Sequence, residues 1–249
     1  MAVKKYIPNL FTLLNLFSGL IALVYAFHSD FKMAFVWVCA GIFFDFWDGF
    51  LARILKAQSP VGLQLDSLAD MVTSGVVPGV VVYKLLSISY GISRSMDLGN
   101  DLLLRYVPYL GFVITLASCY RLAKFNVDTR QTESFIGLPT PANALFILSI
   151  PLVLEQYYPS GFIFETLANP YVLIGISFLS AYLLNAEIPL FSLKVKSFEF
   201  NKIKLQVFFL LLCIVLIVFL KYLGVTLSIL SYIILSVINN SLAKKEAKV

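Results

Sequence analysis

Charged residues are scarce in this chain of 249 residues. Lys, Arg, Asp and Glu together make up 13% of it, whereas hydrophobic residues make up 59%. Soluble domains contain about 25% charged and about 45–50% apolar residues, so this composition excludes an ordinary soluble globular domain. It also excludes a disordered chain, because disorder requires low hydrophobicity and high charge.

Cysteine and histidine are rare as well, with three cysteines and one histidine. Cys39, Cys119 and Cys213 lie far apart within apolar stretches, which excludes a disulfide-stabilised scaffold. The single histidine, His28, follows an apolar stretch, and we expect it at a membrane interface rather than in a metal site. Basic residues are spread among the loops without forming one basic face, so we expect no nucleic-acid partner.

Long apolar segments are abundant instead. At about 20 residues per span, the chain has room for about eight transmembrane helices joined by short loops. The segments are 9–28, 33–55, 67–90, 102–124, 141–157, 170–189, 205–221 and 223–240. The first lacks a small-residue cleavage site after its apolar run, so we interpret it as a span rather than a signal peptide. The sequence therefore predicts an all-α, polytopic transmembrane helix bundle.

The distribution of Lys and Arg supports this number of spans. If both termini are cytoplasmic, the cytoplasmic loops and ends contain Lys4, Lys5, Arg53, Lys56, Arg121, Lys124, Arg130, Lys194, Lys196, Lys202, Lys204, Lys244, Lys245 and Lys248. The opposite side contains only Lys32, Arg94, Arg105 and Lys221. Basic loops are typical of the cytoplasmic side, so we predict both termini there, in the cytoplasmic membrane. Such loops also suit anionic membrane lipids, although topology alone produces the same bias.

Four aspartates lie in the second and third segments, where charge is unfavourable. An acidic residue at the bilayer centre costs about 2.5–3.5 kcal/mol on insertion scales. Asp45 and Asp48 are three residues apart and Asp66 and Asp70 four apart, so each pair lies on one face of a helix. Ser59-Pro60 marks a short turn that makes the two helices antiparallel neighbours. We therefore predict that the four carboxylates converge on one polar pocket near the cytoplasmic ends of the helices.

Clustered carboxylates repel one another, and hard divalent cations with oxygen ligands, such as Mg²⁺ or Mn²⁺, are the natural compensation. Two alternatives remain open. The acids can form a structural network with nearby arginines, or they can line the path of a cation transporter, which predicts paired repeats and acids near the midplane. The sequence shows neither repeats nor midplane placement. The small residues Gly49, Ala52 and Gly62 fit either close helix packing or space for a bulky ligand.

Written out, the acidic region reads Asp45-Phe-Trp-Asp48-Gly49-Phe-Leu-Ala52-Arg53, eight residues, Gly62, three residues, Asp66, three residues, Asp70. It resembles the complete signature of the CDP-alcohol phosphatidyltransferase family, in every fixed position and spacing. Segments Ile7–Asn15, Arg121–Val127 and Gly137–Asn143 resemble the membrane-embedded phosphatidylserine synthases of that family. The likeness predicts a family core over residues 1–190, followed over 191–249 by two additional transmembrane helices and a short basic tail.

The resemblance implies transfer of a phosphatidyl group from CDP-diacylglycerol to the hydroxyl of L-serine, giving phosphatidylserine and CMP. It implies that Asp45, Asp48, Asp66 and Asp70 bind two divalent cations, and that Asp70 is also the general base. The residues expected to bind the nucleotide are Asn9, Thr12, Gly49, Ala52, Arg53 and Gly62. The family likeness also implies a homodimer. Another acceptor alcohol, glycerol-3-phosphate or an inositol phosphate, remains the alternative.

Five residues are candidates for binding the acceptor. Arg121 offers a bidentate fork for the serine carboxylate, and Lys124 and Asn126 lie close to it in sequence. Thr140 and Asn143 begin the fifth span after a turn rich in Gly and Pro, where irregular backbone can line a polar cavity. Anchoring of a span end and ordinary helix initiation are the plainer interpretations of these two groups.

Overall fold

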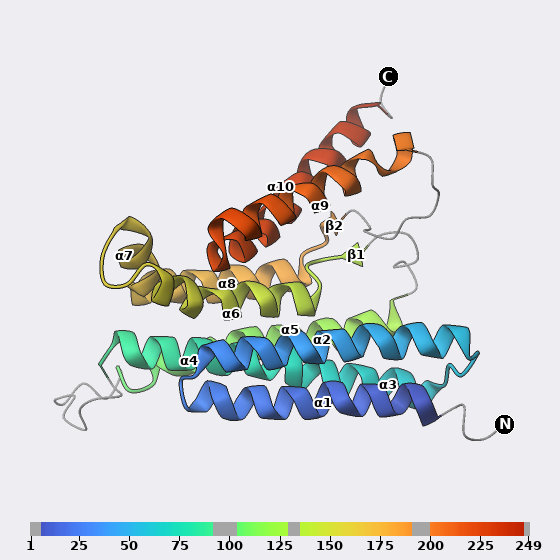
Figure 1. Cartoon of the computed structure of the whole chain (residues 1–249), viewed down its shortest axis with the longest axis horizontal. Coiled ribbons are helices and arrows are strands. Elements are labelled where there is room, and N and C mark those ends of the chain that lie inside the picture. The colour runs from blue at the N-terminus through green and yellow to red at the C-terminus, as the bar shows by residue number, and fades with distance from the viewer. Residues whose placement is uncertain (1–5, 92–103, 129–134, 191–199, 247–249) are drawn as a thin grey trace.

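The computed structural model describes residues 6–91, 104–128, 135–190 and 200–246, which are almost entirely helical (Figure 1). The helices are α1 (Tyr6–Phe27), α2 (Phe31–Ile54), α3 (Pro60–Asp70), α4 (Val77–Ser89), α5 (Val113–Val127), α6 (Thr140–Gln156), α7 (Phe162–Ala168), α8 (Pro170–Asn185), α9 (Phe200–Leu220) and α10 (Tyr222–Glu246). A π-helical segment, Met71–Val76, joins α3 to α4, and a 3-10 segment, Val107–Phe112, precedes α5. The one departure from the all-α prediction in these ranges is an antiparallel pair of two-residue strands, β1 (Phe135–Ile136) and β2 (Pro189–Leu190).

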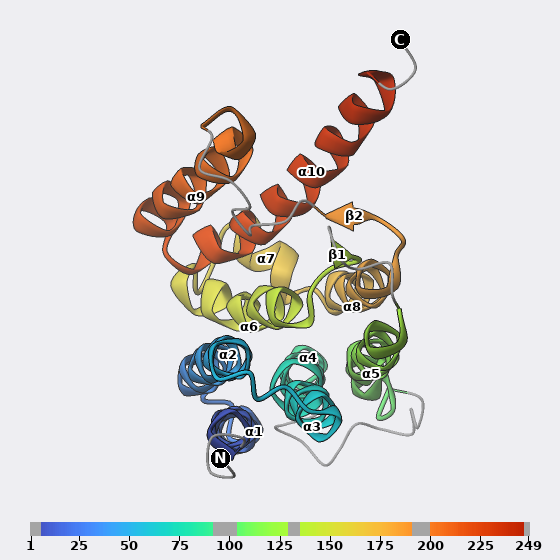
Figure 2. The ribbon, with the colours of Figure 1, turned by 90° about the vertical axis from the view of Figure 1, so that its right-hand side faces the viewer.

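The helices form a bundle with an inclined C-terminal pair. Figure 2 looks along α1, α2, α4, α5, α6 and α8, whereas α9 and α10 are tilted and lie beyond α6 and α8, away from α1. The main core consists mostly of small and branched side chains from six helices, α1, α2, α4, α5, α6 and α8, and includes Ala22, Val38, Val81 and Ile147. A second cluster, Leu138, Leu190, Phe209 and Tyr232, attaches α9 and α10 to the strand pair.

Four of the described helical segments are long and apolar enough to cross a membrane. They are Tyr6–Phe27, Phe31–Ile54, the continuous run Pro60–Ser89, and Tyr222–Ser241. Helices α7 and α8 meet at an angle of 71° and make a fifth if they form one broken span. Two other predicted segments correspond to shorter helices: α5 has 15 residues and α6 has 17. A helix of that length extends about 26 Å, less than the roughly 30 Å of bilayer hydrocarbon, so helix length alone does not confirm eight spans.

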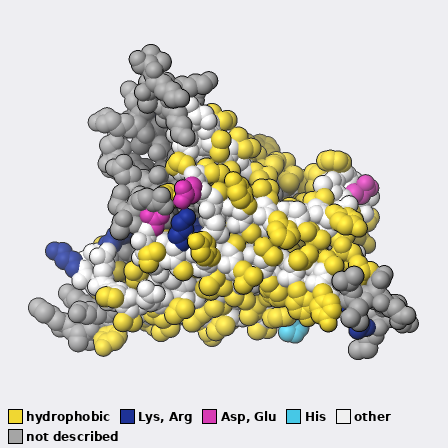
Figure 3. Space-filling model, turned by 180° about the vertical axis from the view of Figure 1, so that it is seen from behind, with side chains coloured by type: hydrophobic (Ala, Val, Ile, Leu, Met, Phe, Trp, Pro, Cys, Tyr) yellow, Lys and Arg dark blue, Asp and Glu magenta, His cyan; other side chains and the backbone are white. Residues whose placement is uncertain are grey.

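The outer surface of the bundle is strongly apolar. Leu116 is 70% exposed and Phe219 79% exposed, and many other large hydrophobic side chains point outward. On the face in Figure 3, hydrophobic side chains cover the body of the molecule, and charged side chains gather toward its two ends. A soluble protein does not expose apolar surface on this scale. The chain is an integral membrane protein.

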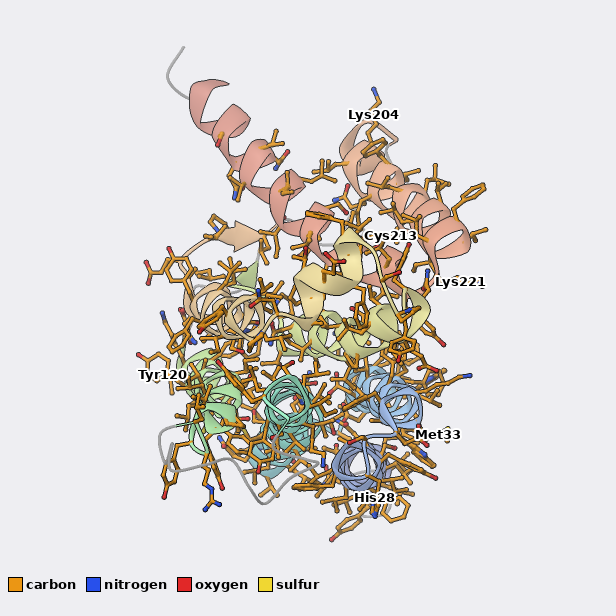
Figure 4. The ribbon with its side chains drawn as sticks, turned by 90° about the vertical axis from the view of Figure 1, so that its left-hand side faces the viewer. His28, Met33, Tyr120, Lys204, Cys213 and Lys221 are labelled. Atoms are coloured by element: carbon orange, nitrogen blue, oxygen red, sulfur yellow. The ribbon has the colours of Figure 1, made fainter. Side chains whose placement is uncertain are left out.

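The two ends of the bundle differ in what they contain. The start of α1, the end of α10 and the link between α2 and α3 lie toward the same end of the molecule (Figure 1). His28, which is exposed, and Lys221 mark the α1–α2 and α9–α10 turns at the opposite end (Figure 4). The acidic residues of the predicted site therefore belong to the end at which α1 starts and α10 ends.

Candidate active site

Local capping determines where the helix carrying Asp66 and Asp70 begins. The Oγ of Ser59 accepts a hydrogen bond from the backbone N–H of Gly62 at 3.0 Å, and Pro60 occupies the first turn. Both are favourable at a helix start. The helix therefore begins at Pro60 rather than near 67, where the apolar segment was predicted to start. Asp66 lies inside α3, and Asp70 is its last residue, within the continuous helical run Pro60–Ser89.

Three of the predicted aspartates meet where α2 and α3 face each other. Carboxylate oxygens of Asp45, Asp48 and Asp66 all lie within 4.8 Å of one another. The Oδ2 atom of Asp48 is buried and has no hydrogen-bond partner among the described residues. Three converging oxygen donors, one of them unsatisfied, fit a hard divalent cation such as Mg²⁺ or Mn²⁺. The residues present thus form a candidate metal site.

Asp70 lies one helical turn beyond Asp66 and is held by α1. The Nδ2 of Asn15 donates a hydrogen bond to Oδ1 of Asp70 at 3.1 Å, and Asn15 is completely buried. The hydroxyl of Thr73, in the π-helical segment after Asp70, donates to the backbone oxygen of Asn15 at 3.2 Å. These two hydrogen bonds link α1 to the last residue of α3 and to the π-helical segment that follows it. Such π-helical segments are frequent at functional sites.

A cavity of about 630 Å³ opens beside the acidic cluster, a size typical of small-ligand sites. Asp48 and Asp66 line it, and so do all the residues predicted to bind a nucleotide: Asn9, Thr12, Gly49, Ala52, Arg53 and Gly62. The structure thus brings these eight residues together around one space.

Two glycines at this cavity serve different purposes. A Cβ atom added to Gly49 would meet no other atom of the described chain within 4 Å, so the missing side chain leaves open space. A Cβ atom added to Gly62 would lie 3.2 Å from Oδ1 of Asn9 and 3.1 Å from Oγ of Ser59. Of the two interpretations given for the small residues, room for a ligand suits Gly49 and close packing suits Gly62.

Sequence reasoning anticipated Asn9 and Thr12 on α1 but missed Asn15, which lies on the same helix and contacts Asp70. The sequence predicted α2 and α3 as direct neighbours, but α1 packs against both of them and provides part of the cavity wall. Asn15 had been given no role. The available signal was the spacing of Asn9, Thr12 and Asn15, three polar side chains at three-residue intervals on an otherwise apolar helix.

Arg121, on α5, is a buried acceptor candidate whose charge is felt by Asp70. It is 7% exposed, and its charge interacts with that of Asp70. Its Nε atom has no hydrogen-bond partner within the part of the chain that the structure describes. A buried guanidinium with an unused Nε–H donor can bind an anionic group.

The remaining acceptor candidates have partners within the protein. Nδ2 of Asn126 donates to Oγ of Ser67 at 2.9 Å, which places Asn126 beside the helix that carries Asp66. The Nζ atom of Lys124 lies 3.5 Å from Oε1 of Glu187. Lys124 therefore already has a counter-charge.

Thr140 and Asn143 are buried at the start of α6. Oδ1 of Asn143 accepts a hydrogen bond from Oγ of Ser180 on α8. Neither residue lines the 630 Å³ cavity as the described residues form it. The structure therefore does not bring these two side chains to the acidic cluster as it does the six nucleotide candidates.

Comparison with known proteins agrees with this site. The family profile described as CDP-alcohol phosphatidyltransferase matches residues 5–180. A Helicobacter pylori (strain J99) protein named CDP-diacylglycerol–serine O-phosphatidyltransferase is 32% identical over 153 residues, 61% of this chain and 59% of the relative. A Bacillus subtilis protein of the same name is 34% identical over 141 residues, 55% of this chain and 70% of the relative.

An archaetidylserine synthase of Methanothermobacter thermautotrophicus is 30% identical over 176 residues, 70% of this chain and 66% of the relative. The aligned part of the chain spans about three fifths of the length of the Helicobacter relative. The profile match includes α1, α2 and α3, and hence the acidic cluster and the cavity. The chain belongs to the CDP-alcohol phosphatidyltransferase family.

Proposed function

We propose that this protein transfers the phosphatidyl group of CDP-diacylglycerol to the hydroxyl of L-serine, releasing CMP. The observation that carries the proposal is the cavity in which carboxylates meet small and polar side chains at one end of the bundle. The names of the relatives support serine as the acceptor. We assign the transferase core to residues 1–190, and α9, α10 and the tail to an addition over 191–249.

Asp45, Asp48, Asp66 and Asp70 are the proposed ligands of two divalent cations, Mg²⁺ or Mn²⁺. Bound there, the cations would neutralise the diphosphate and stabilise the charge that develops on the attacking and leaving oxygens. Asn9 and Thr12 hydrogen-bond the nucleotide, and Gly49, Ala52 and Gly62 leave room for it. Arg53, at the cavity wall, contacts a phosphate or orients an acid.

Asp70 is the proposed general base. With its Oδ1 held by Asn15, its Oδ2 takes the proton of the serine hydroxyl. The hydroxyl oxygen then forms a bond to the phosphorus that bears the diacylglycerol, and the bond from that phosphorus to CMP breaks. No covalent enzyme intermediate is needed. Arg121 binds the serine carboxylate, and Lys124, Asn126, Thr140 and Asn143 are proposed to complete the surroundings of the acceptor.

We further propose eight spans with both termini cytoplasmic, in a homodimer in the cytoplasmic membrane. The first and last helices begin and end at the same end of the bundle, as an even number of crossings requires (Figure 1). The excess of basic residues in loops on that side supports a cytoplasmic location for it, and the active site then lies near the cytoplasmic face.

The function is tested with the purified chain reconstituted in vesicles that contain CDP-diacylglycerol. We expect CMP release with radiolabelled L-serine and little with glycerol-3-phosphate or an inositol phosphate. CMP release that depends on one of the phosphorylated acceptors instead would contradict the serine assignment. Cation flux into the vesicles without CMP release with any acceptor would support the transporter interpretation and refute the enzymatic one.

Removal of divalent cations should abolish the reaction reversibly. Loss of several kcal/mol of charge stabilisation lowers a rate by about 100-fold or more, so EDTA treatment should reduce CMP release by at least that factor. Added Mg²⁺ or Mn²⁺ should restore it. Binding of Mn²⁺, followed by electron paramagnetic resonance, should weaken in Asp48→Asn. Undiminished turnover after complete metal removal would rule out the metal assignment.

A further inference from the structure

A second, much smaller cavity lies beside Arg121, where α5 packs against α8 (Figure 2). It has a volume of about 10 Å³ and is lined by Arg121, Lys124, Ile136, Leu184 and Asn185. This is room for about one water-sized group. An ammonium group is of that size. What the cavity can bind depends on two polar atoms, Oδ1 of Asn185 and Nε of Arg121.

Asn185, the last residue of α8, offers the cavity a hydrogen-bond acceptor. Its Nδ2 donates to the backbone oxygens of Ala117, on α5, at 3.1 Å and of Ala181 at 3.3 Å, so both amide hydrogens are used. Its Oδ1 is buried and accepts no hydrogen bond from the residues that the structure describes. The hydrogen bonds of Nδ2 therefore fix the orientation of this amide, and Oδ1 remains available as an acceptor.

Arg121 offers the same cavity a donor, since its Nε is also unsatisfied within the described chain. A guanidinium and a carbonyl oxygen complement a carboxylate and an ammonium, the two charged groups of a free amino acid. Lys124 and Glu187 largely neutralise each other, because their charged atoms lie 3.5 Å apart. The charge of Arg121 interacts with that of Asp70. Without a large surplus of positive charge, these surroundings suit a net-neutral zwitterion better than a doubly charged phosphate ester.

The turn before α6 holds this end of α8 in place. Gly137 has a φ of +77°, and a Cβ atom added to it would lie 2.5 Å from the backbone oxygen of Leu184. The backbone N–H of Gly137 donates to Ile188 at 3.0 Å, and that of Leu138 donates to Leu183 at 2.9 Å. This segment had been singled out for Thr140 and Asn143. Its observed contacts instead fix the position of Asn185, the residue after Leu184.

We propose that Asn185 determines acceptor specificity by accepting a hydrogen bond from the ammonium group of the amino acid whose carboxylate Arg121 binds. The inference rests on the proposed function, which supplies serine as the acceptor, and adds a residue that distinguishes serine from alcohols without an amino group. In the competing arrangement, a water molecule bridges Asn185 to Arg121, and Asn185 only positions the guanidinium.

The test compares Asn185→Leu, which removes the acceptor at similar volume, with the wild-type chain in CDP-diacylglycerol vesicles. We expect the KM for L-serine to rise about tenfold or more, as for loss of one hydrogen bond to a charged group. The KM for CDP-diacylglycerol should stay unchanged. Ser177→Ala, on the same helix, is the control, since its hydroxyl bonds Leu173 within α8.

A second measurement separates ammonium binding from positioning of Arg121. The competitor 3-hydroxypropionate is serine without its amino group, so its inhibition constant should be the same for the wild type and Asn185→Leu. An increase by the same factor as the KM for serine would overturn the proposal in favour of positioning. If Asn185→Leu does not fold, Asn185→Ala provides the same comparison. Absence of serine-dependent CMP release in the wild type would refute the proposed function, whereas an unchanged KM in a folded variant would refute only this inference.

Discussion

Asp70→Asn should lower the turnover of serine by about 100-fold to 10,000-fold, the usual contribution of a general base. The substitution removes the proton acceptor but retains the size of the side chain. The hydrogen bond from Nδ2 of Asn15 to Oδ1 persists, because an amide oxygen accepts it equally well. The three carboxylates that converge within 4.8 Å, those of Asp45, Asp48 and Asp66, remain in this variant. Binding of Mn²⁺ and of CDP-diacylglycerol should therefore be largely retained, and equilibrium binding measures this separately from single-turnover kinetics.

The matched control is Asp30→Asn. Asp30 is the N-cap of α2 and accepts a hydrogen bond from the backbone N–H of Met33 at 3.0 Å. Asn is an equally good N-cap, so this variant should fold and turn over like the wild type. Near-normal turnover in Asp70→Asn would show that another group takes the proton.

Gly49→Leu should abolish binding of CDP-diacylglycerol without destabilising the fold. The added side chain would enter the 630 Å³ cavity, because nothing in the described chain lies within 4 Å of the position of its Cβ. Displacement of the reacting groups by about 1 Å is enough to lower a rate by about 100-fold, so turnover should fall by at least that factor. The helix itself should be stabilised by about 1 kcal/mol, since glycine is a poor helix former.

Gly175→Leu is the control for Gly49→Leu. Gly175 lies in α8, is exposed, and likewise has no atom of the described residues within 4 Å of an added Cβ. Both variants gain the same helix propensity, but only one fills the cavity. We expect equal unfolding temperatures and loss of nucleotide–lipid binding in Gly49→Leu alone. Normal binding of CDP-diacylglycerol by Gly49→Leu would place the nucleotide elsewhere.

The grouping of the acidic residues followed from sequence spacing. Asp45 and Asp48 share a helix face because they are three residues apart, and the short link with Ser59-Pro60 joins α2 directly to the helix that carries Asp66. The structure places carboxylate oxygens of Asp45, Asp48 and Asp66 within 4.8 Å. Local periodicity and one turn were sufficient here because the elements involved are consecutive in the chain.

The acceptor region was less predictable, because its contacts join distant segments. Lys124 has Glu187 as its counter-charge across 63 positions of sequence, and Asn143 bonds Ser180 on another helix. Neither pairing follows from a local pattern. The number of spans was inferred from apolar segments and loop charge, but helices such as α6 are shorter than the bilayer hydrocarbon, so the positions of the segments were more predictable than their lengths.

Composition and helical periodicity are local properties, and they were enough to predict an apolar helical membrane protein with the CDP-alcohol phosphatidyltransferase pattern. Which side chains meet across helices depends instead on tertiary packing. Asn15 bonds Asp70, Arg121 lies near that carboxylate, and Gly49 faces open space. Each of these relations depends on how helices far apart in the chain pack, and such packing is the sum of many weak contacts that no single motif records.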